Sequence, residues 1–269
     1  MRKQRIYQIL FFAAAISLSS CEKVIDVKLD SSANQVVIEG NITDQQGPQT
    51  IKISQSVPYT DSNVYPAVTG AEVTVTDDAG GSWIFTEVQP GSYTFGSLKG
   101  VPGRTYTLHV NANNTTYTAM STMPEPVALD SLSLDILTFG GDENKQVRVH
   151  YKDPENQINQ YLYIMKINGV QAKRIFVEND RFTNGNDVTS LLFYSGENDD
   201  EDPKSDDQVE IEMQGIDKSI FKYWFSLTQQ TQNGPAVGVT PGNPPSNINN
   251  NALGYFSAHT TEKKTITID

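Results

Sequence analysis

Apolar and polar residues alternate in short segments between residues 35 and 123, which is the pattern of half-buried β-strands. The alternation is clear at Ile51 and Ile53, and again over residues 104–110. Turn-forming residues separate the segments at 45–48, 77–81, 90–91 and 113–114. The pattern predicts about seven short strands in roughly 90 residues, a spacing typical of a β-sandwich of the immunoglobulin or transthyretin type.

A second β-rich region is predicted from residue 131 to residue 269. Residues 123–126 read Met-Pro-Glu-Pro, and two prolines so close together cannot join a sheet interior, so they indicate a boundary. Asn168-Gly169 is a strong hairpin signal. Residues 216–230 repeat apolar side chains at helical spacing behind Asp217, which predicts one helix capped by that carboxylate. Residues 252–258 and 265–268 are predicted as two closing strands.

The first 20 residues have the pattern of a secretory signal. Arg2, Lys3 and Arg5 precede an apolar run over residues 9–18, which is too short for a good membrane span. Residues 18–21 read Leu-Ser-Ser-Cys, which resembles the lipobox of bacterial lipoproteins. The resemblance implies cleavage before Cys21 and acylation of that residue, and two or three acyl chains give durable attachment to a bilayer. Cys21 is the only cysteine, so it has no disulfide partner within the chain.

The chain is therefore expected to be mainly β, with two sandwich-like domains behind a cleaved lipoprotein signal. The predicted parts are a signal peptide at 1–20, a lipidated tether at 21–34, an immunoglobulin- or transthyretin-like sandwich at 35–123, a linker at 124–130 and a larger β-domain with one helix at 131–269.

The net charge of the chain limits the classes of molecule that it can bind. It carries 20 Lys and Arg against 32 Asp and Glu, a formal net charge of −12. The predicted signal holds three of the basic residues and no acidic one, so the mature chain carries −15. A chain this acidic repels phosphate backbones, which disfavours nucleic-acid binding.

Catalytic motifs are absent from the sequence. His109, His150 and His259 lie far apart and are expected on solvated strand faces. The zinc-protease, serine-hydrolase and phosphate-loop motifs do not occur. We therefore expect no enzymatic activity and no cofactor.

Two weaker sites remain open. Residues 197–202 are rich in carboxylates, and Asp199, Asp200 and Asp202 are candidate Ca²⁺ ligands because Ca²⁺ prefers hard oxygen donors. A block of like charges is more often a solvated loop. Residues 130–132, Asp-Ser-Leu, resemble a short bacterial O-glycosylation sequence, with Ser131 as the acceptor.

Several blocks together resemble one protein family. They cover residues 21–23, 36–43, 70–73, 151–154, 207–210, 242–248 (Gly-Asn-Pro-Pro-Ser-Asn-Ile) and 252–256. The family comprises outer-membrane lipoproteins of the Bacteroidota with a domain of unknown function, commonly encoded beside TonB-dependent transporters. The resemblance implies a location at the outer membrane, on its cell-surface or its periplasmic face, and a role as an accessory subunit. It implies no reaction.

The block at 242–256 begins within a long Asn-, Pro- and Gly-rich loop at 232–251 and leads into the apolar strand that starts at residue 252. A loop of about 20 residues without regular structure is uncommon in a compact domain. One interpretation is a plug that covers one end of the sandwich. The other is a contact surface for a transporter or ligand. The residues concerned are Asn243, Pro244, Pro245, Asn247, Tyr255 and Phe256.

Three functions follow as hypotheses. The first is a non-enzymatic lipoprotein, anchored in the bilayer through Cys21, that captures a peptide or glycan or organises a complex with a TonB-dependent transporter barrel and other surface lipoproteins. The second is a structural, pilin-like surface protein. The third and weakest is a glycan hydrolase, which the missing motifs disfavour.

We expect Cys21→Ala to abolish incorporation of a radiolabelled fatty acid, because the thiol that carries the lipid is lost. Metabolic labelling followed by gel autoradiography measures this. Unchanged labelling of the variant would remove the basis for a lipid anchor.

Overall fold

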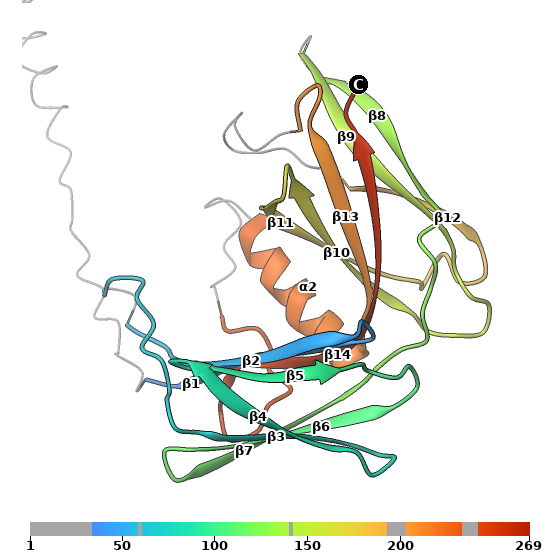
Figure 1. The fold of residues 1–269 in the computed structure, drawn as a ribbon. Helices are drawn as coiled ribbons and strands as arrows, with labels where there is room; N and C mark the ends of the chain where they lie inside the picture. The colour runs from blue at the N-terminus through green and yellow to red at the C-terminus, as the bar shows by residue number, and fades with distance from the viewer. Residues whose placement is uncertain (1–33, 59–60, 140–141, 193–202, 233–241) are drawn as a thin grey trace, which may run out of the picture. The chain divides into compact units, whose positions relative to one another are not determined.

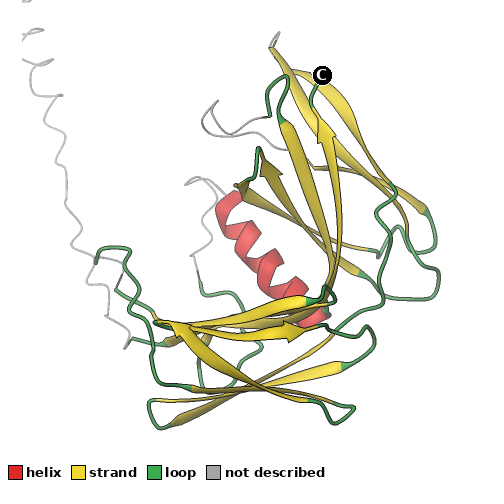
Figure 2. Ribbon diagram, viewed as in Figure 1, coloured by secondary structure: helices red, strands yellow, loops and turns green. Residues whose placement is uncertain are grey.

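The computed structural model describes residues 34–58, 61–139, 142–192, 203–232 and 242–269. Cys21 and the acidic run at 197–202 lie outside these ranges. The described chain is mainly β, with one helix among its described residues (Figures 1 and 2). The fold class predicted from the sequence is confirmed.

Seven strands form the first part of the chain, as the alternation predicts. They are β1 (Val36–Thr43), β2 (Gly47–Gln55), β3 (Glu72–Asp77), β4 (Ser82–Gln89), β5 (Ser92–Leu98), β6 (Thr105–Ala112) and β7 (Thr115–Thr122). Their alternating apolar residues point inward and form one buried core, which includes Ile38, Ile51, Tyr93 and Leu108. Asn113 and Asn114 both have positive φ, so the β6–β7 hairpin uses the tight turn that asparagine tolerates.

The second part contains seven further strands and the helix. They are β8 (Ser131–Phe139), β9 (Asp142–Lys152), β10 (Gln160–Ile167), β11 (Val170–Asn179), β12 (Asp187–Leu192), β13 (Gln208–Gly215), α2 (Lys218–Gln232) and β14 (Leu253–Thr267). The Asn168-Gly169 hairpin is confirmed between β10 and β11. The predicted helix is also confirmed, beginning two residues later than expected. Strand β12 was not predicted.

Strand β14 belongs to both parts of the chain. Its first half pairs in parallel with β1, from Val37–Leu253 to Thr43–His259. Its second half pairs antiparallel with β13, from Gly215–Thr260 to Gln208–Thr267. One eleven-stranded sheet therefore runs in the order β11-β10-β13-β14-β1-β2-β5-β4-β3-β6-β7, and a three-stranded sheet runs β12-β9-β8.

This continuity changes the expected organisation at one place. The sequence predicts two strands at 252–258 and 265–268, whereas the structure has one 15-residue strand. Ala252, Phe256 and Ala258 pack in the first core, while Ile268 packs in the second. The segment expected to belong only to the domain at 131–269 thus completes the sandwich at 35–123, and residues 34–269 form one compact unit.

Helix α2 packs on the face of the large sheet opposite the second core. It contacts β10, β11 and β14 (Figure 1). Ile220 is buried against Leu162 and Ile216, with Trp224 partly buried beside them. Strand β10 is therefore covered on both faces, which explains its nearly continuous run of buried residues.

We expect Gly254→Ala to destabilise the protein by about 3 kcal/mol or more. Gly254 has a φ of +89°, and an added Cβ would lie 2.1 Å from the backbone oxygen of Ile38 on β1. Urea unfolding measures the change. Gly96→Ala is the matched control, because a Cβ there has nothing within 4 Å. Equal stability of the two variants would contradict the close β1–β14 pairing.

Candidate functional site

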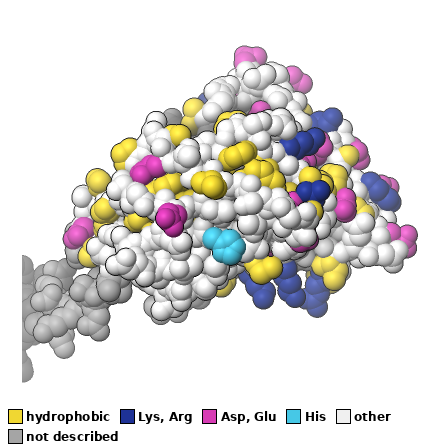
Figure 3. All heavy atoms as spheres, turned by 60° about the horizontal axis from the view of Figure 1, so that its bottom comes forward, with side chains coloured by type: hydrophobic (Ala, Val, Ile, Leu, Met, Phe, Trp, Pro, Cys, Tyr) yellow, Lys and Arg dark blue, Asp and Glu magenta, His cyan; other side chains and the backbone are white. Residues whose placement is uncertain are grey.

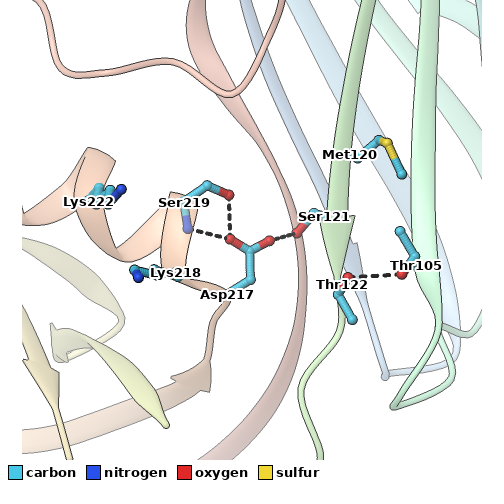
Figure 4. A pocket seen from close by; sticks show the side chains of 8 residues that line it. All are labelled: Thr105, Met120, Ser121, Thr122, Asp217, Lys218, Ser219 and Lys222. Carbon is cyan, nitrogen blue, oxygen red and sulfur yellow. Dashed lines mark hydrogen bonds between the residues drawn. The ribbon is translucent and has the colours of Figure 1, made fainter. Parts of the chain in front are cut away.

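The residues that lie between β7 and the start of α2 form a polar junction. Ser121 on β7 is 2% exposed, and its hydroxyl donates to Asp217 Oδ2 and accepts from the Ala258 backbone N–H on β14 at 2.9 Å (Figure 4). The other oxygen of Asp217 accepts from the backbone N–H groups of Ser219 at 2.7 Å and Ile220 at 3.0 Å. The sequence prediction that Asp217 caps the helix is confirmed.

An open groove of about 500 Å³ lies at this junction. Its lining comes from β6, β7 and the first turn of α2: Thr105, Met120, Ser121, Thr122, Asp217, Lys218, Ser219 and Lys222. Lys218 and Lys222 are one helical turn apart and exposed, so both ammonium groups lie on the same side of α2. Met120 is 60% exposed and adds an apolar side chain to the lining of the groove.

The groove offers positive charge and hydroxyl groups. The Thr105 and Thr122 hydroxyls bond each other at 2.9 Å across the β6–β7 pair. The Asp217 carboxylate is already used by the cap and by Ser121, and no histidine lines the groove. The arrangement is suited to binding an anionic or hydroxyl-bearing group. The hydroxyls of Ser121 and Ser219 both donate to the Asp217 carboxylate, which also caps the helix.

Sequence reasoning did not find this groove. Ser121 and Asp217 are 96 positions apart, and only the pairing of β14 with β1 and β13 brings them together. Of the residues at this junction, the sequence identified only Asp217, as the expected cap of the helix.

The Asn-rich loop that was singled out from the sequence closes an edge of the large sheet. Asn249 pairs with Thr118 of β7: its N–H donates to the Thr118 oxygen at 3.0 Å, and its side-chain oxygen accepts from the Thr118 N–H at 2.7 Å. Asn250 Nδ2 donates to the Thr116 oxygen at 2.6 Å. Asn247 Nδ2 donates to the oxygens of Met120 at 3.1 Å and Phe256 at 2.8 Å. These side chains occupy the position of a further strand, which favours the plug interpretation.

The remaining residues of that block divide between surface and core. Asn243 and Pro245 are exposed, and Pro244 is half-buried. Phe256 is fully buried in the first core, so its side chain is not accessible to a partner in this structure. Its ring points inward because its strand position alternates with that of Tyr255.

Tyr255 lies in an aromatic cluster beneath α2. Its ring centroid is 5.0 Å from that of Tyr223 and 5.3 Å from that of Trp224. Burial raises the pKa of Tyr255, and it raises the pKa of Tyr223 to about 12. Both rings fix the helix on β14, so Tyr255 is mainly a packing residue.

The other sequence candidates are placed as follows. Ser131 is exposed at the start of β8, a position open to modification. The acidic candidates Asp199, Asp200 and Asp202 lie outside the described residues, as does Cys21. Among the described residues no group of three or more His, Cys, Asp or Glu side chains is arranged to hold a metal ion.

One histidine differs from its expected place. His259 on β14 is 3% exposed rather than solvated, and its Nδ1 lies 3.0 Å from the Ser257 hydroxyl. Burial lowers the pKa of His259 to about 4, partly offset by the Glu212 carboxylate, so the ring is neutral near pH 7.

Within the described residues no helix has the length and apolar character needed to cross a membrane. The outer face of the sandwich shows apolar side chains scattered among polar atoms rather than one broad apolar surface (Figure 3).

Residues 22–265 match the family described as "Domain of unknown function (DUF4249)". The chain belongs to this family. No curated protein matches it. Among solved structures it is similar to a segment of two fibronectin type III domains from chicken tenascin, with 10% identity, a TM-score of 0.25, and coverage of 87% of this chain and 99% of that chain.

We expect Asn247→Ala to lower the free energy of unfolding by about 2–3 kcal/mol, because three hydrogen bonds between the loop, β7 and β14 are lost. Asn243→Ala, an exposed position in the same loop, is the control and should change stability by less than about 0.5 kcal/mol. Urea unfolding of both variants measures this. A neutral Asn247→Ala would show that the loop does not stabilise the edge.

Proposed function

We propose that this protein is a lipid-anchored, non-enzymatic subunit of an outer-membrane nutrient-import complex, where it assists a TonB-dependent transporter by capturing ligand or organising the complex. The observation that carries the proposal is the Leu-Ser-Ser-Cys sequence at 18–21 behind a basic and apolar leader. The family match begins at residue 22, so the predicted signal peptide and Cys21 lie outside the matched region, as the proposal of a removed leader expects.

The β7–α2 groove is the proposed place of ligand capture. Lys218 and Lys222 present two positive charges on an otherwise acidic chain, so they can attract a carboxylate-bearing peptide or an acidic glycan. The groove is open and its walls are held by the Ser121–Asp217 contact, which supports binding without a large rearrangement.

A role in transport rather than polymer formation is supported by the closed β7 edge. A pilin-like subunit needs an edge that accepts a strand from its neighbour. Here Asn247, Asn249 and Asn250 already occupy the edge of β7. Closure of this edge disfavours strand exchange at that position.

The proposal predicts that the intact lipidated chain, purified gently from native membranes, carries a large barrel protein with it. Mass spectrometry of the eluate identifies the partner, and size-exclusion chromatography measures the size of the assembly. Polymers of this chain alone would contradict the proposal and favour a structural surface protein.

A double charge reversal tests the groove separately from the barrel association. Lys218→Glu with Lys222→Glu should weaken binding of acidic peptides or glycans at least tenfold, measured by calorimetry. Lys99→Glu with Lys264→Glu is the matched control, because both lysines are exposed and lie outside the groove. Equal binding by the two double variants would remove the groove from the proposal. It would not affect the proposed association with the barrel, which the purification tests.

A further inference from the structure

Two loops at one end of the second sandwich are tied together by a network of hydrogen bonds. They are residues 153–159, between β9 and β10, and residues 180–186, between β11 and β12. The Asn159 N–H donates to Asp180 Oδ2 at 2.7 Å, and the Asp180 N–H donates to the Asn159 oxygen at 3.1 Å. Asn184 Nδ2 donates to the Gln157 oxygen at 3.1 Å. The bonds therefore lie on both sides of Ile158.

The base of these loops is anchored in the protein interior. Asp153 is 0% exposed; one of its oxygens accepts from the Tyr161 hydroxyl at 2.5 Å, and the other accepts from the Gly185 N–H at 3.3 Å. The Asp180 backbone oxygen accepts from the N–H groups of Thr183 and Asn184, each at 2.9 Å. The buried Asp153 carboxylate and the Asp180 backbone oxygen are thus satisfied at the base, although the side-chain oxygen of Asn159 is buried without a partner. These bonds let the chain itself fix the loop conformation.

The same loops expose large apolar side chains. Ile158 is 83% exposed and Phe182 is 86% exposed, the highest values among the large hydrophobic residues described. A mobile loop could expose such residues by default, but these two are flanked by residues held in the network. The cost of holding apolar surface in water on an ordered loop suggests a surface that is covered in a complex.

Arg181 adds a charge to this apolar pair. Its guanidinium lies 5.2 Å from the centre of the Phe182 ring. Among the described residues Arg181 has no carboxylate partner, although acidic side chains outnumber basic ones in the chain. An aromatic ring with an arginine beside it is a composition enriched where protein interfaces carry most of their binding energy.

We propose that Ile158, Arg181 and Phe182 form a docking surface for a folded protein partner, which receives the two apolar side chains in an apolar pocket and pairs a carboxylate at its rim with Arg181. This goes beyond the ligand-capture role proposed above and does not rest on the β7–α2 groove.

Charge favours this occupant over two others. Two copies of the mature chain, each with a net charge of −15, repel each other, whereas a partner of another sequence need not carry this charge. An anionic bilayer surface would be repelled by the exposed carboxylate of Glu155, whereas the exposed Asp187 carboxylate pairs with Lys152 at 3.4 Å.

Site-specific photocrosslinking in native membranes tests the surface. The intact lipidated chain carries p-benzoylphenylalanine in place of Phe182 or, in a second protein, in place of Ile158. Tyr65, 57% exposed on the first sandwich, is the matched control position. We expect both test positions to give one adduct with the same protein, identified by mass spectrometry, at a yield at least tenfold above the control. Arg181→Glu should lower that yield at least fivefold, and Arg181→Lys should largely preserve it.

Four results would overturn the proposal. They are a yield at the test positions no higher than at Tyr65, adducts only with lipid, adducts only with a second copy of this chain, and no effect of Arg181→Glu. The unfolding midpoints of Phe182→Ser and Ile158→Ser should stay within about 2 °C of the parent, because both side chains are already exposed. A fall of more than about 5 °C would assign these residues a structural role and also overturn the proposal.

Discussion

The parallel pairing of β14 with β1 is the contact on which the rest of the structure depends. A strand that arrives at the end of the chain lies beside the first strand of the sandwich, and then continues as the partner of β13. Both cores need it, because Phe256 and Ala258 fill the first and Ile268 closes the second. Gly254 permits the close approach, since any larger residue would meet the Ile38 carbonyl. The two sandwiches are therefore joined by a shared strand as well as by the linker.

The candidate groove is a consequence of that sharing. Strand β14 brings the Ala258 N–H to Ser121, and Ser121 in turn holds the cap of α2. A buried hydroxyl that accepts one bond and donates another links three elements that are distant in sequence. Lys218 and Lys222 are then presented beside β7 by a helix whose first turn is fixed. The binding surface thus takes its shape from the same contacts that unite the chain.

Asparagine serves two different purposes in the two loop systems. Asn247, Asn249 and Asn250 copy the hydrogen bonds of a neighbouring strand, so they cover backbone groups that would otherwise attract another chain. Asn159 and Asn184 instead tie two loops to each other, while Ile158 and Phe182 on those loops face water. The first arrangement covers the edge of β7, and the second keeps apolar side chains exposed on ordered loops. The distinction depends on partners in space and not on the composition of the loops.

By itself the sequence determined the lipobox pattern, the alternating strands, the Asn168-Gly169 hairpin and the capped helix, because each is set by neighbouring residues. Tertiary structure decided what depends on distant pairing. The polar stretch from His259 to Lys264 does not look like a buried strand, yet pairing with β1 up to His259 and with β13 from Thr260 onward makes β14 continuous there. The buried position of Phe256, the Ser121–Asp217 junction and the exposed Phe182 follow from contacts across some 20 to 220 residues, which no local pattern records.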